Sequence, residues 1–204
     1  MSTANETAPL MGLVLAGGQS RRMGRDKATL TWHGEPLWRR QAELLAEQGM
    51  PVGISLRAEQ TLDIGGFAPV HDAMDDAGPL AGFLSAWAQF AQSALLVVAC
   101  DLPLLDAATI RFLIEQRDPT KLATAYRSAN DGLPEPLCAI WEPRSRAALE
   151  ASVAAGKRCP RKVLINGGDD VRLLDLPHPT ALENANTPEE FARLEALMKK
   201  ESTQ

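Results

Sequence analysis

The sequence feature that most constrains the fold is a run of seven apolar residues, 94–100 (ALLVVAC), followed at once by Asp101. The run includes two valines and has no polar side chain that could face water. Its length suits a β-strand, and its lack of alternation indicates that both faces of the strand are covered. We therefore expect a central strand of a parallel sheet that carries helices on both sides.

Strand and helix patterns alternate along the rest of the chain. We expect further strands at residues 13–16, 52–56, 69–71, 121–127, 137–141 and 171–176, and helices at 36–48, 78–92, 107–116, 145–155 and 188–199. This alternation predicts an α/β fold, with a single domain built on a mostly parallel twisted sheet flanked by helices. We assign residues 1–9 to a flexible N-terminal tail and residues 10–200 to the folded domain.

Composition narrows the class of protein. With 204 residues, 45% of them apolar, the chain can bury a full core, and its net charge of −5 argues against non-specific nucleic-acid binding. Cys100, Cys138 and Cys159 are widely spaced and fit neither a zinc pattern nor a disulfide framework, which favours a reducing cytoplasm. The N-terminus does not resemble a signal peptide, and no apolar run is long enough to span a membrane, so we expect a cytoplasmic protein without a membrane partner.

A glycine-rich stretch, residues 13–27 (LVLAGGQSRRMGRDK), follows the first predicted strand. Gly17 and Gly18 stand at the end of that strand, where bare backbone can approach a ligand. Four cations follow within nine residues of Gly18: Arg21, Arg22, Arg25 and Lys27. Exposed N–H donors beside clustered positive charge suit a polyphosphate.

This stretch fits neither of the two common phosphate-binding fingerprints. A Walker loop ends in Gly-Lys-Ser/Thr, whereas Lys27 is followed by Ala28. The dinucleotide fingerprint needs a glycine at its sixth position, where this chain has Arg22. The sequence thus indicates a phosphate-binding loop of another kind.

Three chemically distinctive residues, Gly17, Asp72 and Asp101, each follow a predicted strand. The carboxyl ends of parallel strands share one edge of the sheet, and ligands bind there. A carboxylate at the end of a buried strand is costly unless it is paired or binds a metal. We therefore expect Asp101 to bind Mg²⁺, which takes one or two protein carboxylates together with phosphate oxygens and water. The competing role of helix N-cap is better filled by Asp106.

Near the C-terminus, residues 183–191 read ENANTPEEF. Thr187 and Glu190 have the spacing of a capping box for the last helix. Trp32, Trp38, Trp87 and Trp141 are expected to pack in the core rather than to stack on a ligand.

Taken together, these motifs resemble the signature of the MobA-type nucleotidyltransferases, the molybdenum cofactor guanylyltransferases. The pattern L-x-G-G-x-S-x-R-M-G-x-D-K is filled by Leu15, Gly17, Gly18, Ser20, Arg22, Met23, Gly24, Asp26 and Lys27. Four further blocks extend the resemblance through most of the chain: GEPL at 34–37, Asp72 with GPLAG at 78–82, CDLP at 100–103 and NANTPEE at 184–190.

The resemblance implies a Rossmann-like nucleotidyltransferase domain with a small acceptor-binding lobe. It implies transfer of GMP from GTP to molybdenum-molybdopterin with Mg²⁺, giving the guanine dinucleotide cofactor and pyrophosphate. Molybdoenzymes or cofactor-biosynthesis proteins would then be partners. The alternatives are a cytidylyltransferase for the same pterin, a transferase for another phosphorylated acceptor, and a nucleotide-binding protein without catalysis. The block at 78–82 and the pair Asp26-Lys27 resemble the guanylyl branch more than the cytidylyl branch.

The resemblance also implies roles for individual residues. Catalysis would involve Lys27, Arg22 and Asp101, with Asp101 as the metal ligand. The nucleotide-binding residues would be Leu15, Ala16, Gly17, Gly18, Lys27, Asp72 and Asp101, and the acceptor-binding residues Asn184 and Asn186. Glu135 departs from the family pattern, because it stands in the acceptor region where the family commonly has a histidine.

Overall fold

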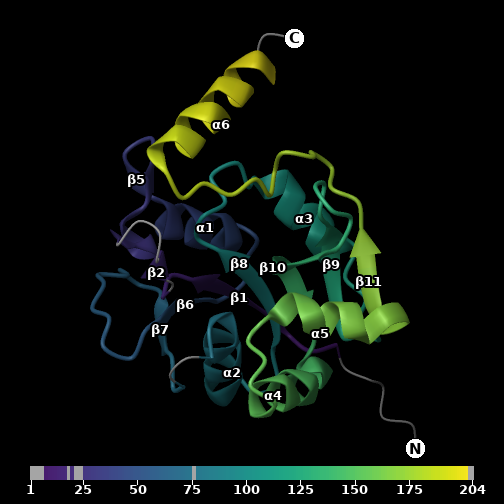
Figure 1. Ribbon diagram of the computed structural model, residues 1–204. Helices are drawn as coiled ribbons and strands as arrows, with labels where there is room; N and C mark the ends of the chain where they lie inside the picture. The colour runs from purple at the N-terminus through teal and green to yellow at the C-terminus, as the bar shows by residue number, and fades with distance from the viewer. Residues whose placement is uncertain (1–6, 18, 21–24, 75–76, 202–204) are drawn as a thin grey trace, which may run out of the picture.

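A seven-stranded sheet forms the centre of the computed structural model, which describes residues 7–17, 19–20, 25–74 and 77–201 (Figure 1). The strands are β1 (Leu10–Leu15), β6 (Val52–Leu56), β7 (Ala68–His71), β8 (Ala94–Ala99), β9 (Ala123–Arg127), β10 (Pro134–Trp141) and β11 (Val171–Leu174). Their order across the sheet is β11-β9-β10-β8-β1-β6-β7. Among the seven strands described in this sheet, only β10 runs antiparallel to its neighbours, which confirms the mostly parallel sheet.

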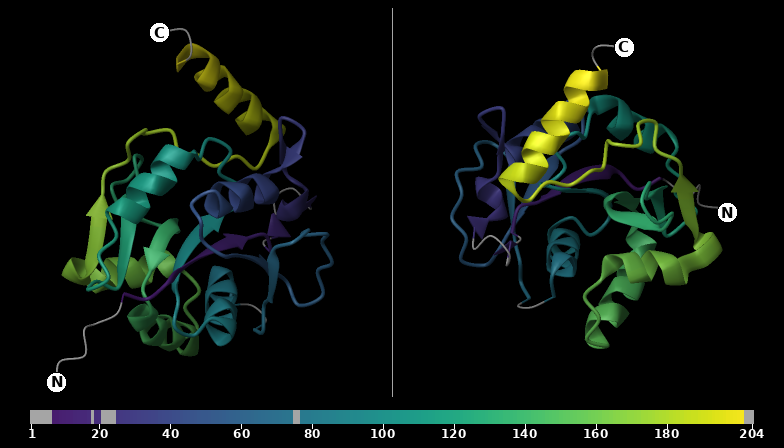
Figure 2. Two further views of the ribbon diagram at one scale, coloured as in Figure 1. Left: turned by 180° about the vertical axis from the view of Figure 1, so that it is seen from behind. Right: turned by 45° about the horizontal axis from the view of Figure 1, so that its top comes forward.

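Helices cover both faces of this sheet, so the domain has three layers. The helices are α1 (Leu37–Ala46), α2 (Pro79–Gln89), α3 (Ala107–Glu115), α4 (Arg146–Ala154), α5 (Pro160–Gly167) and α6 (Pro188–Glu201). Figures 1 and 2 show α1 and α3 on one face and α2, α4 and α5 on the other. The helices therefore place a hydrophobic layer on each side of the sheet, as expected for an α/β fold.

Strand β8 lies in the middle of the sheet, and all six of its residues are buried. Leu96 and Val98 belong to the core cluster that includes side chains of α1 and α3. Leu95 and Val97 point the other way, into the cluster that includes side chains of α2, α4 and α5. The absence of alternation in residues 94–100 thus reflects burial on both faces, as predicted.

A smaller third cluster connects α6 to the segment that follows the glycine stretch. This segment contains the 3-10 helix η1 (Lys27–Thr29) and a ribbon of β4 (Thr31–Trp32) and β5 (Glu35–Pro36). Leu30, Trp32 and Leu37 pack with Ala185 and Leu194. Past these contacts, α6 extends away from the sheet (Figures 1 and 2).

All four tryptophans are buried, with exposed fractions between 0% and 4%, which confirms their predicted core role. Two of them also satisfy their indole N–H groups. Trp87 donates to the carbonyl of Ser93 over 2.9 Å, and Trp141 donates to the carbonyl of Pro136 over 3.1 Å.

The predicted elements are found within a few residues of their expected ends, with three differences. Helix α5 was missed, because residues 157–162 showed only clustered positive charge. The ribbon β4–β5 and the pair β2 (Gln19–Ser20) and β3 (Arg25–Asp26) were also missed, since strands of two residues show no periodicity. None of the helices in the described ranges is long and apolar enough to cross a membrane.

The predicted tail is also shorter than residues 1–9. The carbonyl of Ala8 accepts a hydrogen bond from Nη2 of Arg117 over 2.9 Å. The carbonyl of Pro9 accepts one from the backbone N–H of Ala94, also over 2.9 Å. Residues 8 and 9 are therefore held against the body of the domain, and residues 1–6 lie outside the described residues.

Candidate active site

The candidate site lies at the edge of the sheet where β1, β6, β7 and β8 have their carboxyl ends. The residues directly after these strands are Ala16, Arg57, Asp72 and Cys100, the last followed by Asp101. From β1 the chain passes to β6 on one side, and from β8 it passes to β9 on the other side. The switch point between β1 and β8 is where open α/β sheets bind ligands, and Gly17 and Asp101 stand on its two sides.

Gly17 allows the loop after β1 to approach the end of β6 closely. A Cβ atom at this position would lie 3.1 Å from the backbone nitrogen of Arg57, 3.3 Å from the carbonyl carbon of Leu56 and 3.5 Å from Oδ2 of Asp72. The backbone cannot move away easily, because the N–H of Ala16 donates to the carbonyl of Ser55 over 3.0 Å. Close packing thus favours glycine at this position.

Two side chains that the sequence analysis did not identify hold the same loop. Nη1 of Arg57 donates to the carbonyl of Gly17 over 3.0 Å, and Nε2 of Gln60 donates to the carbonyl of Ala16 over 3.3 Å. Oε1 of Gln60 accepts from the backbone N–H of Arg57 over 3.1 Å. Arg57 could have been suspected from its place at a strand end, but Gln60 carries no signal in the sequence.

Asp72 is half-buried beside this loop. Its N–H donates to the carbonyl of Leu56 over 2.8 Å, and its Oδ1 accepts from the hydroxyl of Ser55 over 3.1 Å. Burial raises the pKa of Asp72 to about 6, although the Ser55 hydrogen bond and the charges of His71 and Arg57 lower it. A carboxyl group with so perturbed a pKa at a strand end is typical of a functional site.

Asp101 is only 6% exposed, and its loop is held from two directions. Its carbonyl accepts from the N–H of Ala185 over 3.0 Å, and the carbonyl of Leu102 accepts from Nε2 of Gln41 over 2.7 Å. Gln41 is a fully buried residue of α1. The position of the loop is therefore fixed relative to both α1 and the C-terminal segment.

The contact between Asp101 and Ala185 brings the predicted acceptor residues to the same edge, because Asn184 and Asn186 flank Ala185. Asn184 is exposed, and Asn186 is half-buried. The predicted capping box is confirmed, since Oε2 of Glu190 accepts from the N–H of Thr187 over 3.1 Å while Oγ1 of Thr187 accepts from the N–H of Glu190 over 3.2 Å. This box fixes the start of α6 directly after the two asparagines.

Parts of the predicted site cannot be placed. Gly18 and Arg22 lie outside the described residues, and so does the side chain of Lys27, whose backbone opens η1. Leu15 is the last residue of β1. The structure thus brings together Leu15, Ala16, Gly17, Asp72, Asp101 and the two asparagines, and their roles stay predictions.

Few carboxylate side chains at this edge of the sheet are available to bind a metal ion. Within the ranges the structure describes, no group of three or more His, Cys, Asp and Glu side chains could hold a metal ion. Mg²⁺ does not require such a group, because substrate phosphates and water complete its shell. The largely buried carboxylate of Asp101 is therefore compatible with Mg²⁺ binding. The three cysteines are all free.

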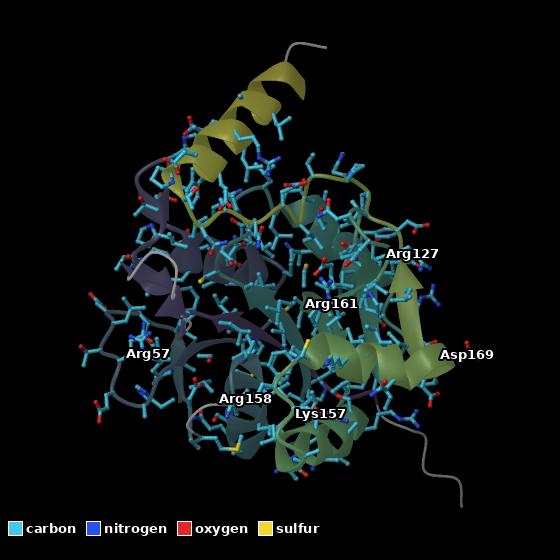
Figure 3. All side chains as sticks on the ribbon, viewed as in Figure 1. Arg57, Arg127, Lys157, Arg158, Arg161 and Asp169 are labelled. Carbon is cyan, nitrogen blue, oxygen red and sulfur yellow. The ribbon has the colours of Figure 1, made fainter. Side chains whose placement is uncertain are left out.

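An ion-pair cluster lies on the other side of β8, where the connection from β9 to β10 meets α5. Nη1 of Arg161 lies 3.0 Å from Oδ2 of Asp131, and Nη2 of Arg161 lies 2.9 Å from Oε2 of Glu135. Figure 3 shows Arg161 above Lys157 and Arg158. Glu135 thus pairs with a cation of α5.

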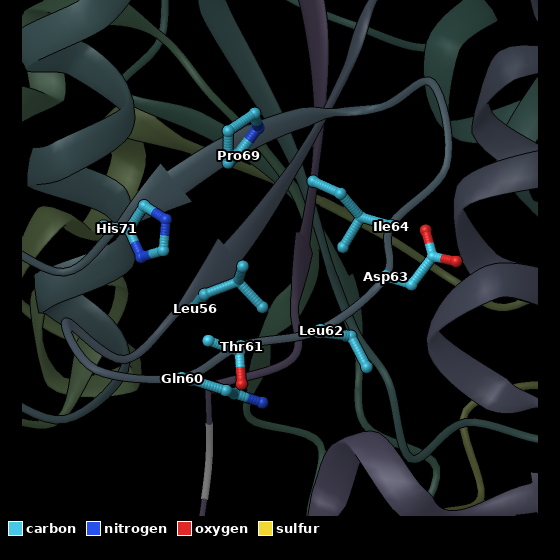
Figure 4. A pocket seen from close by; sticks show the side chains of 8 residues that line it. All are labelled: Leu56, Gln60, Thr61, Leu62, Asp63, Ile64, Pro69 and His71. Atoms are coloured by element: carbon cyan, nitrogen blue, oxygen red, sulfur yellow. The ribbon is translucent and has the colours of Figure 1, made fainter.

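A hollow of about 530 Å³ lies beside β7, on the other side of the glycine loop from Asp101. Its lining residues are Leu56, Gln60, Thr61, Leu62, Asp63, Ile64, Pro69 and His71 (Figure 4). Most of them belong to the connection between β6 and β7, whose Leu62 and Ile64 also pack against the core.

A mostly parallel sheet that carries a glycine loop and an acidic residue at its switch point is typical of an α/β protein that binds its ligand at this edge. Comparison with known proteins identifies the chain as a nucleotidyltransferase. The sequence matches the MobA-like NTP transferase domain over residues 12–171, and the chain belongs to this family.

Relatives support this assignment over nearly the whole chain. The chain is 37% identical to a probable molybdenum cofactor guanylyltransferase of Opitutus terrae, in an alignment that covers 94% of this chain and 96% of that protein. It is 32% identical to the molybdenum cofactor biosynthesis bifunctional protein of Synechocystis sp., over 91% of this chain and 54% of that protein, so it spans about half of that relative.

A solved structure supports the fold. The crystal structure of molybdopterin-guanine dinucleotide biosynthesis protein A from Archaeoglobus fulgidus superposes with a TM-score of 0.72 at 22% identity. The superposition covers 93% of this chain and 99% of that one. The arrangement of strands and helices is therefore shared along the whole domain.

Proposed function

We propose that this protein transfers GMP from GTP to molybdenum-molybdopterin, forming the guanine dinucleotide cofactor and releasing pyrophosphate. The observation that carries the proposal is the meeting of Gly17, Asp72, Asp101 and the segment 184–186 at one edge of the sheet. The name and the end-to-end coverage of the relative from Opitutus terrae support the guanylyl reaction.

The proposed reaction is a direct in-line displacement. The attacking group is a terminal phosphate of the pterin, which is already anionic, so the protein needs no strong general base. Catalysis then depends on holding the two substrates in line and on neutralising charge as pyrophosphate leaves. Lys27 and Arg22 are proposed to supply positive charge on the side of the leaving pyrophosphate.

Mg²⁺ is proposed as the cofactor, and Asp101 would hold it. The ion would neutralise phosphate charge in the transition state. Asp101 suits this role because its carboxylate stands at the switch point and its loop is fixed by Gln41 and Ala185. A fixed ligand avoids reorganisation during the reaction.

The end of β1 and Asp72 are proposed to recognise the base. The guanine edge offers a carbonyl acceptor and two N–H donor groups. Backbone groups near Leu15 and Gly17 and the Asp72 carboxylate match these, whereas cytosine would leave some of them unpaired. One unpaired buried polar group costs about 1–3 kcal/mol, so a preference for GTP over CTP of roughly ten- to hundred-fold is expected.

Asn184 and Asn186 are proposed to line the acceptor side, next to the Asp101 loop. The product would pass to molybdoenzymes or to other proteins of cofactor biosynthesis. The test is incubation of the purified protein with molybdopterin, Mg²⁺ and each nucleoside triphosphate separately, followed by identification of the dinucleotide. A guanine dinucleotide supports the proposal, a cytosine dinucleotide assigns the cytidylyl reaction, and no product with any triphosphate leaves a nucleotide-binding role.

A further inference from the structure

The two backbone carbonyls at the end of β1 are each held by a side chain from the turn 57–60. The guanidinium of Arg57 lies 3.0 Å from the carbonyl of Gly17, and the amide nitrogen of Gln60 lies 3.3 Å from the carbonyl of Ala16. We call these two contacts the carbonyl clamp. The paired residues are 40 and 44 positions apart in the chain, so the clamp exists only in the folded domain.

The clamp determines how the loop presents its peptide groups. In a planar trans peptide the C=O and the N–H point in opposite directions. Because the carbonyl of Ala16 points toward Gln60, the N–H of Gly17 points away from the turn 57–60. Rotation of this peptide would break the hydrogen bond to Gln60, a largely buried residue that is 9% exposed.

The turn 57–60 borders the hollow beside β7. The hollow of about 530 Å³ opens on this side, and Gln60 and Thr61 line it (Figure 4). Within the turn, the N–H of Arg57 donates to Oε1 of Gln60 over 3.1 Å, and the N–H of Gln60 donates to the carbonyl of Arg57 over 3.0 Å. The turn is therefore held by its own hydrogen bonds, and its two side chains in turn hold the loop.

We propose that Arg57 and Gln60 are positioning residues for the nucleoside triphosphate, which fix the Ala16–Gly17 backbone in its binding conformation before the nucleotide arrives. This inference rests on the proposed function for the identity of the ligand. Without the clamp, the binding-competent conformation of the loop is only one of several. The apparent affinity then falls in proportion to the competent fraction, while the bound complex reacts as before.

The kinetic test uses Gln60→Glu, an almost isosteric change. The new side chain can still accept from the N–H of Arg57, but it cannot donate to the carbonyl of Ala16. We expect the KM for GTP to rise about tenfold with kcat within about twofold, the signature of lost uniform binding. Arg57→Ala is expected to raise KM by at least as much, and Arg57→Lys, which keeps one donor group, by less.

Glu59→Gln is the matched control, because Glu59 is an exposed residue of the same turn. Its KM should equal that of the wild type. A raised KM for Arg57→Ala together with an unchanged KM for Gln60→Glu would overturn the proposal, because Arg57 would then act on the nucleotide directly. A large fall in kcat in Gln60→Glu with unchanged KM would overturn it too.

Hydrogen exchange on the nucleotide-free protein separates this inference from the proposed function. Gln60→Glu should speed amide exchange at Ala16, whose N–H donates to the carbonyl of Ser55, while strand β8 exchanges as in the wild type. Exchange as slow as in the wild type would overturn the clamp even if GTP is the substrate. If the wild type transfers no guanylyl group, the proposed function fails, but the exchange result still decides whether the clamp orders the loop.

Discussion

At the scale of single residues, Asp72 is a carboxyl group whose charge the fold disfavours. Burial raises its pKa from 3.8 to about 6, against the lowering effect of Ser55, His71 and Arg57. The folded state therefore binds the proton more tightly than the unfolded chain does. The stability that the protonated form contributes is fully present below pH 3.8 and is lost as the pH rises through about 6.

Asp72→Asn should consequently stabilise the fold at neutral pH while it impairs nucleotide transfer. We expect a gain in the free energy of unfolding of about 1 kcal/mol at pH 7.5, after allowance for the partial exposure of the side chain. The gain should shrink toward pH 4, where the wild-type side chain is protonated. Urea unfolding of both proteins at the two pH values measures this, and an equal difference at both would contradict it.

Asp101 and Lys27 are predicted to act on phosphate and metal rather than on the fold. Asp101→Ala should abolish transfer and leave the far-ultraviolet circular dichroism unchanged. Lys27→Ala should lower turnover by about 10² to 10³, since one preorganised charge contact contributes a few kcal/mol. Turnover is measured at saturating Mg²⁺. If Asp101→Ala turns over as fast as the wild type, Asp101 is not the metal ligand. If Lys27→Ala is less stable but turns over normally per folded molecule, the role of Lys27 is structural.

At the scale of elements, the site depends on how closely α2 approaches β6. A Cβ atom at Gly82 would lie 2.5 Å from Oγ of Ser55 and 3.0 Å from Cδ2 of Leu15. Farther along α2, the hydroxyl of Ser85 accepts from the N–H of Ala73 over 3.0 Å. Small side chains on this helix thus place it directly against the residues around Asp72.

Gly82→Ala tests this packing by the sign of its effect. Helix propensity alone would make the change stabilising by about 1 kcal/mol. The added methyl group would instead displace Ser55 from its hydrogen bond to Asp72, so we expect lower stability and a higher KM for GTP. Ala88→Ser, at an exposed position of α2, is the control. A more stable Gly82→Ala protein with unchanged KM would contradict the account.

The elements also show what the sequence could and could not predict. Strand β8 was predictable because a run of seven apolar residues has the length and the composition of a strand that is buried on both faces. Helix α5 was not, because its buried residues Pro160, Val163 and Leu164 are too few to stand out among the surrounding cations. The edge that joins Gly17, Asp72 and Asp101 was predictable from parallel topology alone.

The carbonyl clamp could not be predicted, because Arg57 and Gln60 contact backbone carbonyls rather than matching side chains. Such contacts depend on the path of the β6–β7 connection, and any long side chain with an N–H donor could make them. The proximity of Asn184 and Asn186 to Asp101 was likewise available only through the family resemblance. A thirteen-residue segment without helix or strand separates β11 from α6, and its course has no periodicity.

At the scale of the whole molecule, a buried ion pair lies at the edge of the sheet opposite the candidate site. At the edge away from the site, Glu142 follows β10, and Arg117 follows the end of α3. Nε of Arg117 lies 2.6 Å from Oε1 of Glu142, and Nη2 lies 2.8 Å from Oε2. The two side chains are only 11% and 3% exposed, and Arg117 also holds Ala8.

Glu142→Gln should therefore lower the free energy of unfolding by about 3 kcal/mol, because it leaves a buried guanidinium without its counter-ion. The KM for GTP should not change. Glu150→Gln is the matched control, since Glu150 forms an exposed pair with Arg146 within one helix. That substitution should lower the free energy of unfolding by less than about 0.5 kcal/mol. Equal losses in the two variants would show that the buried pair has no special weight.

The most direct test of the central claim is competition between GTP and CTP in a single reaction with molybdopterin and Mg²⁺. The guanine edge matches the groups near Leu15, Gly17 and Asp72, so the guanine dinucleotide should exceed the cytosine dinucleotide by roughly ten- to hundred-fold. Asp101→Ala in the same mixture should give neither product. Equal incorporation of the two bases, or an excess of the cytosine product, would contradict guanylyl transfer by this protein.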